Sequence, residues 1–234
     1  MRRLAPMLAL LLAACVSPRL VAVSAEDWQP DAPDMQAMAR EFTDVSRKVS
    51  NAARTECNRR TTAVNCDFVV LVDLDPRAPA NAFQTLDDKG RPVIIFTQSM
   101  IRSTLNADEV AFVMGHEAAH HVLNHIARQA QNAKDGARSF GDRARALGED
   151  AAAIEAAQEL GAEVGVQSYA REFELEADQL GTIITYRSGY NPLIGAKYFA
   201  RIPDPGDQFF ATHPPNAQRV QMVLQTAAGL GVTQ

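Results

Sequence analysis

The stretch His116-Glu117-Ala118-Ala119-His120 decides how the rest of this chain is interpreted. Residues four apart lie on the same face of an α-helix, with Cβ atoms about 6 Å apart, so two imidazoles there can bind one ion. Histidine nitrogens bind zinc at about 2.0–2.1 Å. The helix turns Glu117 by about 100° from His116, which places its carboxylate beside the metal as a general base for water. The stretch therefore predicts a zinc site with His116 and His120 as ligands.

A catalytic zinc site needs a third protein ligand, and the acidic segment REFELEAD (residues 171–178) offers several carboxylates. Glu174 and Asp178 are four residues apart and share a helix face. By spacing alone Glu174 is one of several candidates for the third ligand. Asp178 can accept a hydrogen bond from the outer nitrogen of a ligand histidine. We expect Glu172 and Glu176 to point into solvent.

Two further histidines follow the metal motif. On a continuous helix, His121 and His125 would share a face about 140–180° away from His116. We therefore expect both to have hydrogen-bonded structural roles and not to bind the metal. The chain contains no Gly-x-Ser-x-Gly nucleophile motif, so the expected nucleophile is water activated by the metal.

The surrounding pattern predicts an α+β fold that is mainly helical. Asn106 and Glu109 form a capping-box pattern that starts a helix expected to run to about Arg128. Apolar β-branched runs predict strands over Cys66–Leu74 and Pro92–Thr97, which give a small sheet beside the two helices that carry the metal ligands. Further helices are predicted around 35–49, over about 168–187, after Pro192 and after Pro214-Pro215.

Two connecting regions give different signals. Asp87-Asp88-Lys89-Gly90 has the residue types of a turn between the two strands. Residues 131–165 are rich in alanine, charged and punctuated by glycine, and indicate helices and loops without a strong pattern.

The N-terminus has the pattern of a secretory signal. Arg2 and Arg3 precede the apolar residues 4–14, a run too short for a bilayer-spanning helix of roughly 20 residues. The run ends in Leu12-Ala13-Ala14-Cys15, which predicts a lipoprotein-type signal and acylation of Cys15. Ordinary cleavage near Ala25 is the alternative, and it would give a soluble secreted protein.

These signals divide the chain into a signal peptide over 1–15, a tether over 16–33 and a metallopeptidase domain over 34–234. We expect the lipid anchor to attach the protein to a membrane. The residue after Cys15 is Val16 rather than Asp, which favours a periplasmic protein attached to the outer membrane.

The other two cysteines, Cys57 and Cys66, are expected to form a disulfide in an oxidising periplasm. The segment between them lacks the second cysteine pair or nearby histidine of a zinc ribbon. The formal net charge of -5 argues against a nucleic-acid partner, because such proteins need a basic face to neutralise phosphates.

Five motifs occur in an order that is similar to one family: Asn81-Ala82-Phe83, HEAAHH, REFELEAD, GYNP and THPPNAQR. The chain resembles the gluzincin metallopeptidase family of the CaaX prenyl protease and the heat-shock protease HtpX, over about residues 35–228. In build it is closest to the periplasmic members BepA and LoiP. The resemblance implies a zincin-type domain with one zinc ion. It assigns His116, His120 and Glu174 as metal ligands and Glu117 as general base.

The resemblance also implies roles around the metal. Asp178 would support His116, and His213 and Arg219 belong to a family element near the metal. We expect His213 to face the zinc, either as a donor to the oxyanion of the tetrahedral intermediate or as a fourth ligand that switches the enzyme off. A helix-start histidine without a catalytic part is the remaining alternative. The family has a Gly-rich turn after Asn81-Ala82-Phe83, whereas this chain reads QTLDDKG.

The sequence thus predicts a zinc-dependent metalloendopeptidase that acts on a protein or peptide substrate. Resemblance implies that the substrates are misfolded or misassembled cell-envelope proteins. The alternative is a periplasmic chaperone or assembly factor whose zinc site is largely silent. The intact Glu117 argues against that alternative.

Overall fold

The computed structural model describes residues 19–23, 28, 30, 33–204 and 213–233, and it has the predicted α+β, mainly helical architecture. Cys15 and the cleavage position near Ala25 lie outside the described residues. The helices are α1 (Pro33–Arg60), α2 (Gln98–Ser103), α3 (Ala107–Val122), α4 (His125–Ala146), α5 (Ala151–Arg187), α6 (Pro192–Gly195), the 3-10 helix η1 (Ala196–Ala200) and α7 (Asn216–Gly229). The strands are β1 (Leu20–Ala22), β2 (Val69–Asp73), β3 (Ala82–Leu86) and β4 (Pro92–Thr97).

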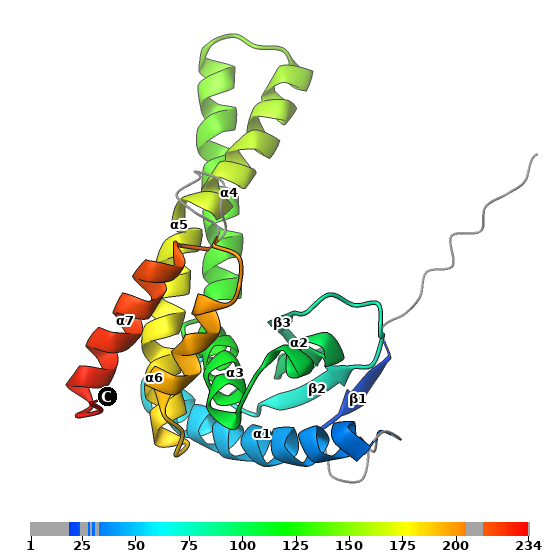
Figure 1. Cartoon of the computed structure of the whole chain (residues 1–234). Coiled ribbons are helices and arrows are strands. Elements are labelled where there is room, and N and C mark those ends of the chain that lie inside the picture. Colours follow the sequence, from blue (N-terminus) through cyan, green and yellow to red (C-terminus); the bar gives the residue numbers. More distant parts are fainter. Residues whose placement is uncertain (1–18, 24–27, 29, 31–32, 205–212, 234) are drawn as a thin grey trace, which may run out of the picture.

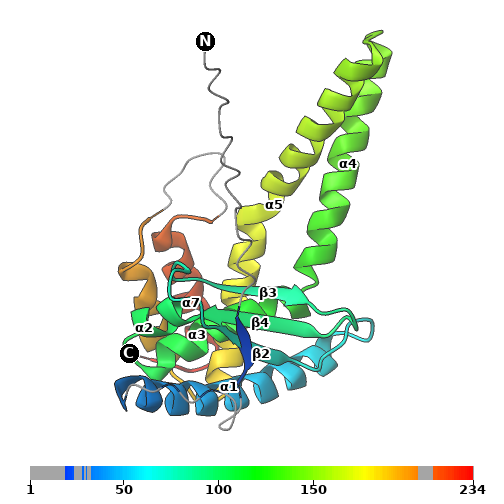
Figure 2. The same cartoon turned by 90° about the vertical axis from the view of Figure 1, so that its right-hand side faces the viewer.

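The elements form a body and a protruding arm. α1 runs along the base of the body beneath the sheet, and α3 lies between the sheet and α5 (Figure 1). α4 and the first half of α5 form an antiparallel pair that rises away from the body in both views (Figure 2). Among the described residues, no helix is long and apolar enough to cross a membrane.

The sheet has the strand order β1-β2-β4-β3. β2 and β4 pair in parallel in the centre, and β1 and β3 are antiparallel edge strands. The predicted turn joins β3 to β4: the Asp87 side chain accepts hydrogen bonds from the backbone N–H groups of Lys89 and Arg91, and Gly90 has a φ of 72°. The sequence pattern did not predict β3. This strand forms one edge of the sheet and lies beside α3.

Strand β1 falls within the segment expected to be a tether. Leu20 pairs with Asp73 and Ala22 with Leu71, and the backbone N–H of Val23 donates to the carbonyl of Val70. These residues therefore belong to the sheet, because the apolar residues of Leu20–Ala22 match the exposed edge of β2 in length and register.

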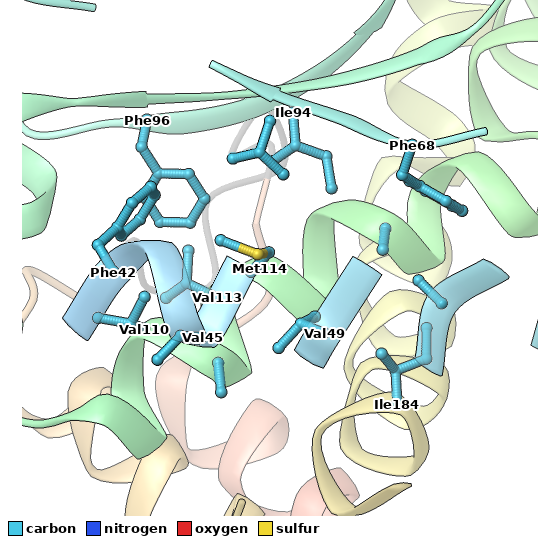
Figure 3. Packing of buried hydrophobic residues seen from close by; sticks show 14 of the residues in the cluster. Phe42, Val45, Val49, Phe68, Ile94, Phe96, Val110, Val113, Met114 and Ile184 are labelled. Atoms are coloured by element: carbon cyan, nitrogen blue, oxygen red, sulfur yellow. The ribbon is translucent and has the colours of Figure 1, made fainter. Parts of the chain in front are cut away.

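The core lies between the sheet and the helices α1, α3 and α5. Figure 3 shows Ile94 and Phe96 pointing from β4 toward the helices, with Phe42 of α1 and Met114 of α3 below them. The rings of Phe42 and Phe96 meet edge to face with centroids 5.0 Å apart. Each such buried side chain stabilises the fold by about 1.5–3 kcal/mol, so the core fixes α3 against the sheet.

Two helix boundaries differ from the prediction. α3 ends at Val122, not near Arg128, because Asn124 takes a left-handed conformation with a φ of 57° and α4 starts at the next residue. α5 starts at Ala151, well before the predicted Ser168. Its Asp150 N-cap accepts a hydrogen bond from the backbone of Ala153.

The weakly patterned region 131–165 forms most of the arm. The two helices approach so closely that a Cβ atom on Gly136 would lie 2.0 Å from the carbonyl oxygen of Gly161. Only glycine allows this backbone contact. The glycines that weaken the helical pattern in the sequence are therefore what packs α4 against α5.

The expected disulfide is present. Cys57 at the end of α1 is bonded to Cys66 just before β2, with Cα atoms 5.7 Å apart. The bridge closes the loop that connects the base helix to the central strand.

Candidate metal centre

The helix that carries the metal motif, α3, is well capped at its N-terminus. The Asn106 side chain accepts a hydrogen bond from the backbone N–H of Glu109, as the capping-box pattern predicts. The Glu109 carboxylate bonds the backbone N–H of Leu105, one residue before the cap, and pairs with Arg201. The pair ties η1 to the first turn of α3, so both flank the same cleft.

α3 and α5 cross in backbone contact beside the first histidine. A Cβ atom on Gly181 would lie 2.9 Å from the Cα and backbone N of His116, and one on Gly115 would lie 2.9 Å from the carbonyl oxygen of Gly181. Thr185 of α5 also lies at the crossing: its hydroxyl bonds the carbonyl of Gly181 within α5 at 2.8 Å and lies 3.4 Å from the carbonyl oxygen of Ala111 on α3. This contact brings the acidic face of α5 against the histidines of α3.

Three predicted ligands meet at this crossing. The Nε2 atoms of His116 and His120 lie 3.0 Å apart. The Glu174 carboxylate approaches both of them, with Oε2 at 3.4 Å from His116 Nε2 and Oε1 at 3.3 Å from His120 Nε2. These are the only histidine, cysteine or carboxylate side chains in the described part of the chain that converge within 4.8 Å as a group of three.

The donor set fits a zinc ion. In a tetrahedral site with ligand bonds of about 2.0–2.1 Å, neighbouring ligand atoms lie about 3.3–3.4 Å apart. The two Nε2 atoms lie 3.0 Å apart, and the Glu174 oxygens lie 3.4 Å (Oε2) from that of His116 and 3.3 Å (Oε1) from that of His120, close to this spacing. Two imidazoles and one carboxylate are a ligand set typical of catalytic zinc, and they leave a fourth position open.

His116 is supported from behind by a buried ion pair. Its Nδ1 lies 2.9 Å from Asp178 Oδ1, and Arg219 donates to both oxygens of that carboxylate at 2.7 and 2.8 Å. Burial lowers the pKa of His116, but the hydrogen bonds with Asp178 and Glu174 outweigh it and raise that pKa to about 10. The same negative contacts that attract a proton to this imidazole attract a metal cation.

Glu174 is ionised in this setting. Burial raises the pKa of its carboxyl, but the neighbouring imidazoles of His116, His120 and His213 hold that pKa well below the usual range. A carboxylate that keeps its charge in a buried position needs cationic neighbours. Its surroundings therefore suit a metal ligand.

His213 reaches the same carboxylate from the segment before α7. Its Nδ1 lies 2.7 Å from Glu174 Oε2, and Pro214 and Pro215 follow it directly and fix the backbone there. The ring remains exposed. The structure thus brings His213 to the metal cluster, as the resemblance implies, by a contact with a ligand oxygen.

Glu117 is half-buried and lies beside the ligand cluster without belonging to it. It lines the cavities on both sides of the cluster. Burial raises the pKa of its carboxyl, although the neighbouring His116 and His120 partly offset this effect. A carboxyl with a raised pKa exchanges protons more readily near neutral pH.

The expected positions of His125 and Glu176 are wrong, although His125 is hydrogen-bonded and lies outside the ligand group, as expected. The turn at Asn124 swings His125 back, so that its Nδ1 lies 2.8 Å from Nδ1 of His120, and it does not share a face with His121. Glu176 is not left in solvent, because His125 Nε2 bonds it at 2.9 Å and Arg128 pairs with it. Burial, with the neighbouring His120, lowers the pKa of His125 to about 4.

His121 has the structural role that was predicted. Its Nε2 lies 2.6 Å from the backbone oxygen of Asn65, and its ring packs edge to face against Phe68. It links the disulfide-closed loop to α3, on the side away from the ligands.

A cleft runs past the cluster between the β3 edge and the helices. On one side lies a cavity of about 390 Å³ with apolar walls that include Met100, Phe112 and Tyr198. On the other side, a cavity of about 240 Å³ is lined by Gln84 of β3 and by residues of the arm. Asn81 and Ala82 border the first cavity, as the resemblance implies for this segment.

Comparison with known protein families gives a match to Peptidase family M48 over residues 39–227. A comparison with curated proteins found no match. The matched region contains the whole ligand triangle, the Asp178–Arg219 pair and His213.

Proposed function

This chain belongs to peptidase family M48, a family of metallopeptidases, and from that premise we propose that it is a zinc-dependent metalloendopeptidase. One observation carries the proposal: the buried Glu174 carboxylate meets the Nε2 atoms of both motif histidines between the two cavities of the cleft. We further propose that it is a gluzincin of the CaaX prenyl protease and HtpX type, because five motifs occur in the order found in that group.

His116, His120 and Glu174 would hold the ion. Zinc supplies Lewis acidity at such a site, which activates water and polarises the scissile carbonyl. Asp178 keeps the Nδ1–H of His116 pointing away from the cluster and so presents Nε2 to it. Arg219 holds Asp178 in place and is itself buried, so the pair acts as a rigid support.

Glu117 is the proposed general base. Its carboxylate takes a proton from the attacking water and passes it to the leaving amine. Its position beside the ligands, and not among them, leaves both oxygens available for this transfer. The raised pKa of its carboxyl favours the second half of the cycle, in which it acts as an acid.

The substrate is proposed to be an extended segment of a protein or peptide chain. β3 is an edge strand, so its outer N–H and C=O groups are available to pair with such a segment. Ala82 lines the cavity on one side of the cluster and Gln84 the cavity on the other. A segment lying along β3 would therefore pass over the ligands with side chains entering both cavities.

We propose two alternative roles for His213. As a donor it would stabilise the oxyanion of the tetrahedral intermediate, and as a fourth ligand it would occlude the open position. Its contact with Glu174 puts it within reach of either role.

A cell-envelope location is the broader part of the proposal. We infer that the chain is processed at Cys15, acylated there and attached to the outer membrane from the periplasmic side, where it degrades misfolded or misassembled proteins. β1 supports Cys15 over Ala25, since cleavage near Ala25 would remove Leu20–Ala22 from the sheet. The Cys57–Cys66 bridge supports an oxidising compartment.

Cys15→Ala is expected to release the protein from membranes or block its processing, and normal membrane attachment of this variant would refute the anchor.

A casein-degradation assay with and without a zinc chelator tests the activity. The proposal predicts cleavage that the chelator abolishes and added zinc restores. Zinc binding without any cleavage would instead favour a chaperone or assembly factor with a silent site.

A further inference from the structure

The helix that carries the metal motif breaks shortly after the second ligand histidine. Asn124 adopts the left-handed conformation, with a φ of 57°, and a new helix starts at His125. On a continuous helix His125 would lie about 140° around the axis from His120. Instead the Nδ1 atoms of the two rings are 2.8 Å apart and the ring centroids 4.9 Å apart. The helix break thus puts a second imidazole behind a ligand imidazole.

The partners of His125 determine the direction of the hydrogen bond. Its Nε2 lies 2.9 Å from Glu176 Oε2, and because an ionised carboxylate can only accept, the hydrogen is on this Nε2. Arg128 Nη1 donates to the same oxygen, so a permanent cation already pairs the carboxylate charge. His125 is then the neutral tautomer with a bare Nδ1, which accepts the Nδ1–H of His120. That leaves His120 Nε2 bare and facing Glu174.

Packing against Phe173 holds the side chains of His125 and Arg128 in one orientation. The ring of His125 stacks on Phe173 with centroids 4.5 Å apart and planes at 11°. The Arg128 guanidinium lies 4.2 Å from the centroid of the Phe173 ring. His125 is only 4% exposed. A side chain fixed on all sides can fix the orientation of the group that it contacts.

The two ligand histidines therefore have matching supports. His116 bonds directly to Asp178, which Arg219 holds, whereas His120 bonds to Glu176 through the interposed His125. Glu174, Glu176 and Asp178 are spaced two residues apart on α5, so one helix supplies a ligand and both carboxylate supports.

We propose that His125, held by Glu176 and Arg128, is a positioning residue that fixes His120 in the tautomer presenting Nε2 to zinc. The inference rests on the proposed zinc site and adds the groups that preorganise it. Supporting residues of this kind typically change metal affinity by about 10–100-fold.

Zinc affinity of the purified chain, measured by competition with a chromogenic chelator, tests the inference. His125→Phe keeps a planar ring against Phe173 but removes the acceptor, and it is expected to weaken zinc binding by about 10–100-fold. His125→Asn places an oxygen near the former Nδ1 and is expected to recover most of that loss. Equal affinity of the Phe variant and the wild type, or no recovery with Asn, would overturn the inference.

Two matched variants on α5 test the role of Glu176, the last residue of the hydrogen-bonded series His120–His125–Glu176. Glu176→Leu and Glu172→Leu remove the same charge from the same helix, but Glu172 is exposed. Only Glu176→Leu is expected to weaken zinc binding, and equal effects of the two variants would refute the role of Glu176. This pair also serves if His125→Phe does not fold.

The tautomer itself is visible by nitrogen NMR of labelled histidines. In wild-type protein, His120 is expected to carry its hydrogen on Nδ1 both with and without zinc, and His125→Phe to lose this preference without zinc. A hydrogen on His120 Nε2 in the metal-free wild type would contradict the inference. If the wild type bound no zinc, the proposed function would fail, whereas this measurement would still test the positioning.

Discussion

Gly181 of α5 lies against the backbone of His116 of α3, so close that a Cβ atom on it would be 2.9 Å from both Cα and N of His116. This contact sets the distance between the helix that carries the histidines and the helix that carries Glu174. The metal centre therefore depends on a residue that has no side chain.

Gly181→Ala is expected to force the two helices apart, because both atoms that the new methyl would meet belong to the backbone. Overpacking of this kind costs about 1–3 kcal/mol, and the shift should also weaken zinc binding. Gly229→Ala in α7 is the control, since nothing lies within 4 Å of its added Cβ. Urea unfolding and zinc titration would show a defect in the first variant alone; a Gly181→Ala protein as stable as the control would contradict the close contact.

Glu174→Ala should lose zinc more severely than any supporting variant, by more than the roughly 10–100-fold typical of those. It removes one of three ligand side chains and leaves two histidines close together without their carboxylate. Metal analysis after dialysis against a chelator measures the effect, with the exposed Glu172→Ala as control. Unchanged zinc content would move the third ligand elsewhere.

The Cys57–Cys66 bridge should stabilise the fold by about 2–3 kcal/mol in the chain-entropy account, given a sequence separation of 9. Urea unfolding with and without reductant measures this difference. A variant with both cysteines replaced by alanine should not respond to reductant. Mass spectrometry that found both thiols freely alkylated in non-reduced protein would contradict the bridge.

His213→Ala separates the two versions of its role. Loss of an oxyanion donor should lower the turnover rate by about 10²–10³-fold, whereas loss of an occluding ligand should raise basal proteolysis. Casein cleavage at saturating zinc gives the direction of the change. Unchanged cleavage together with unchanged zinc affinity would leave His213 with no catalytic part.

The sequence predicts the local part of the metal centre well. His116, Glu117 and His120 depend only on the geometry of one helix, so their spacing is sufficient. Glu174 lies more than fifty residues after His120, on another helix, and spacing alone could not select it from the acidic residues around it. The order of motifs in the resembling family supplied that choice, and the structure brings the residue to the histidines.

The missed features depend on the backbone and not on side-chain periodicity. Asn124 in the left-handed region ended α3 early, and Asn is the residue after Gly that most readily adopts this conformation. Without that turn the sequence placed His125 on the wrong face, so Glu176 and Arg128 had no visible function. In the arm, the helices pack through Gly136 and Gly161, residues that weaken a helical pattern in the sequence.

The edge strands were missed for a related reason. β1 and β3 each pair on one side only, so neither needs the continuous apolar run that identifies the buried β4. Their pairing is decided by the neighbouring strands, which a local pattern cannot represent.

Casein cleavage by Glu117→Gln, measured beside its zinc content, tests the central claim most directly. Gln has nearly the same shape but cannot take a proton from water at neutral pH, so the variant should bind zinc as the wild type does and cleave about 10²–10⁴-fold more slowly. Glu172→Gln, exposed on α5, should cleave at the wild-type rate. A zinc-loaded Glu117→Gln protein that cleaves casein as fast as the wild type would contradict the account.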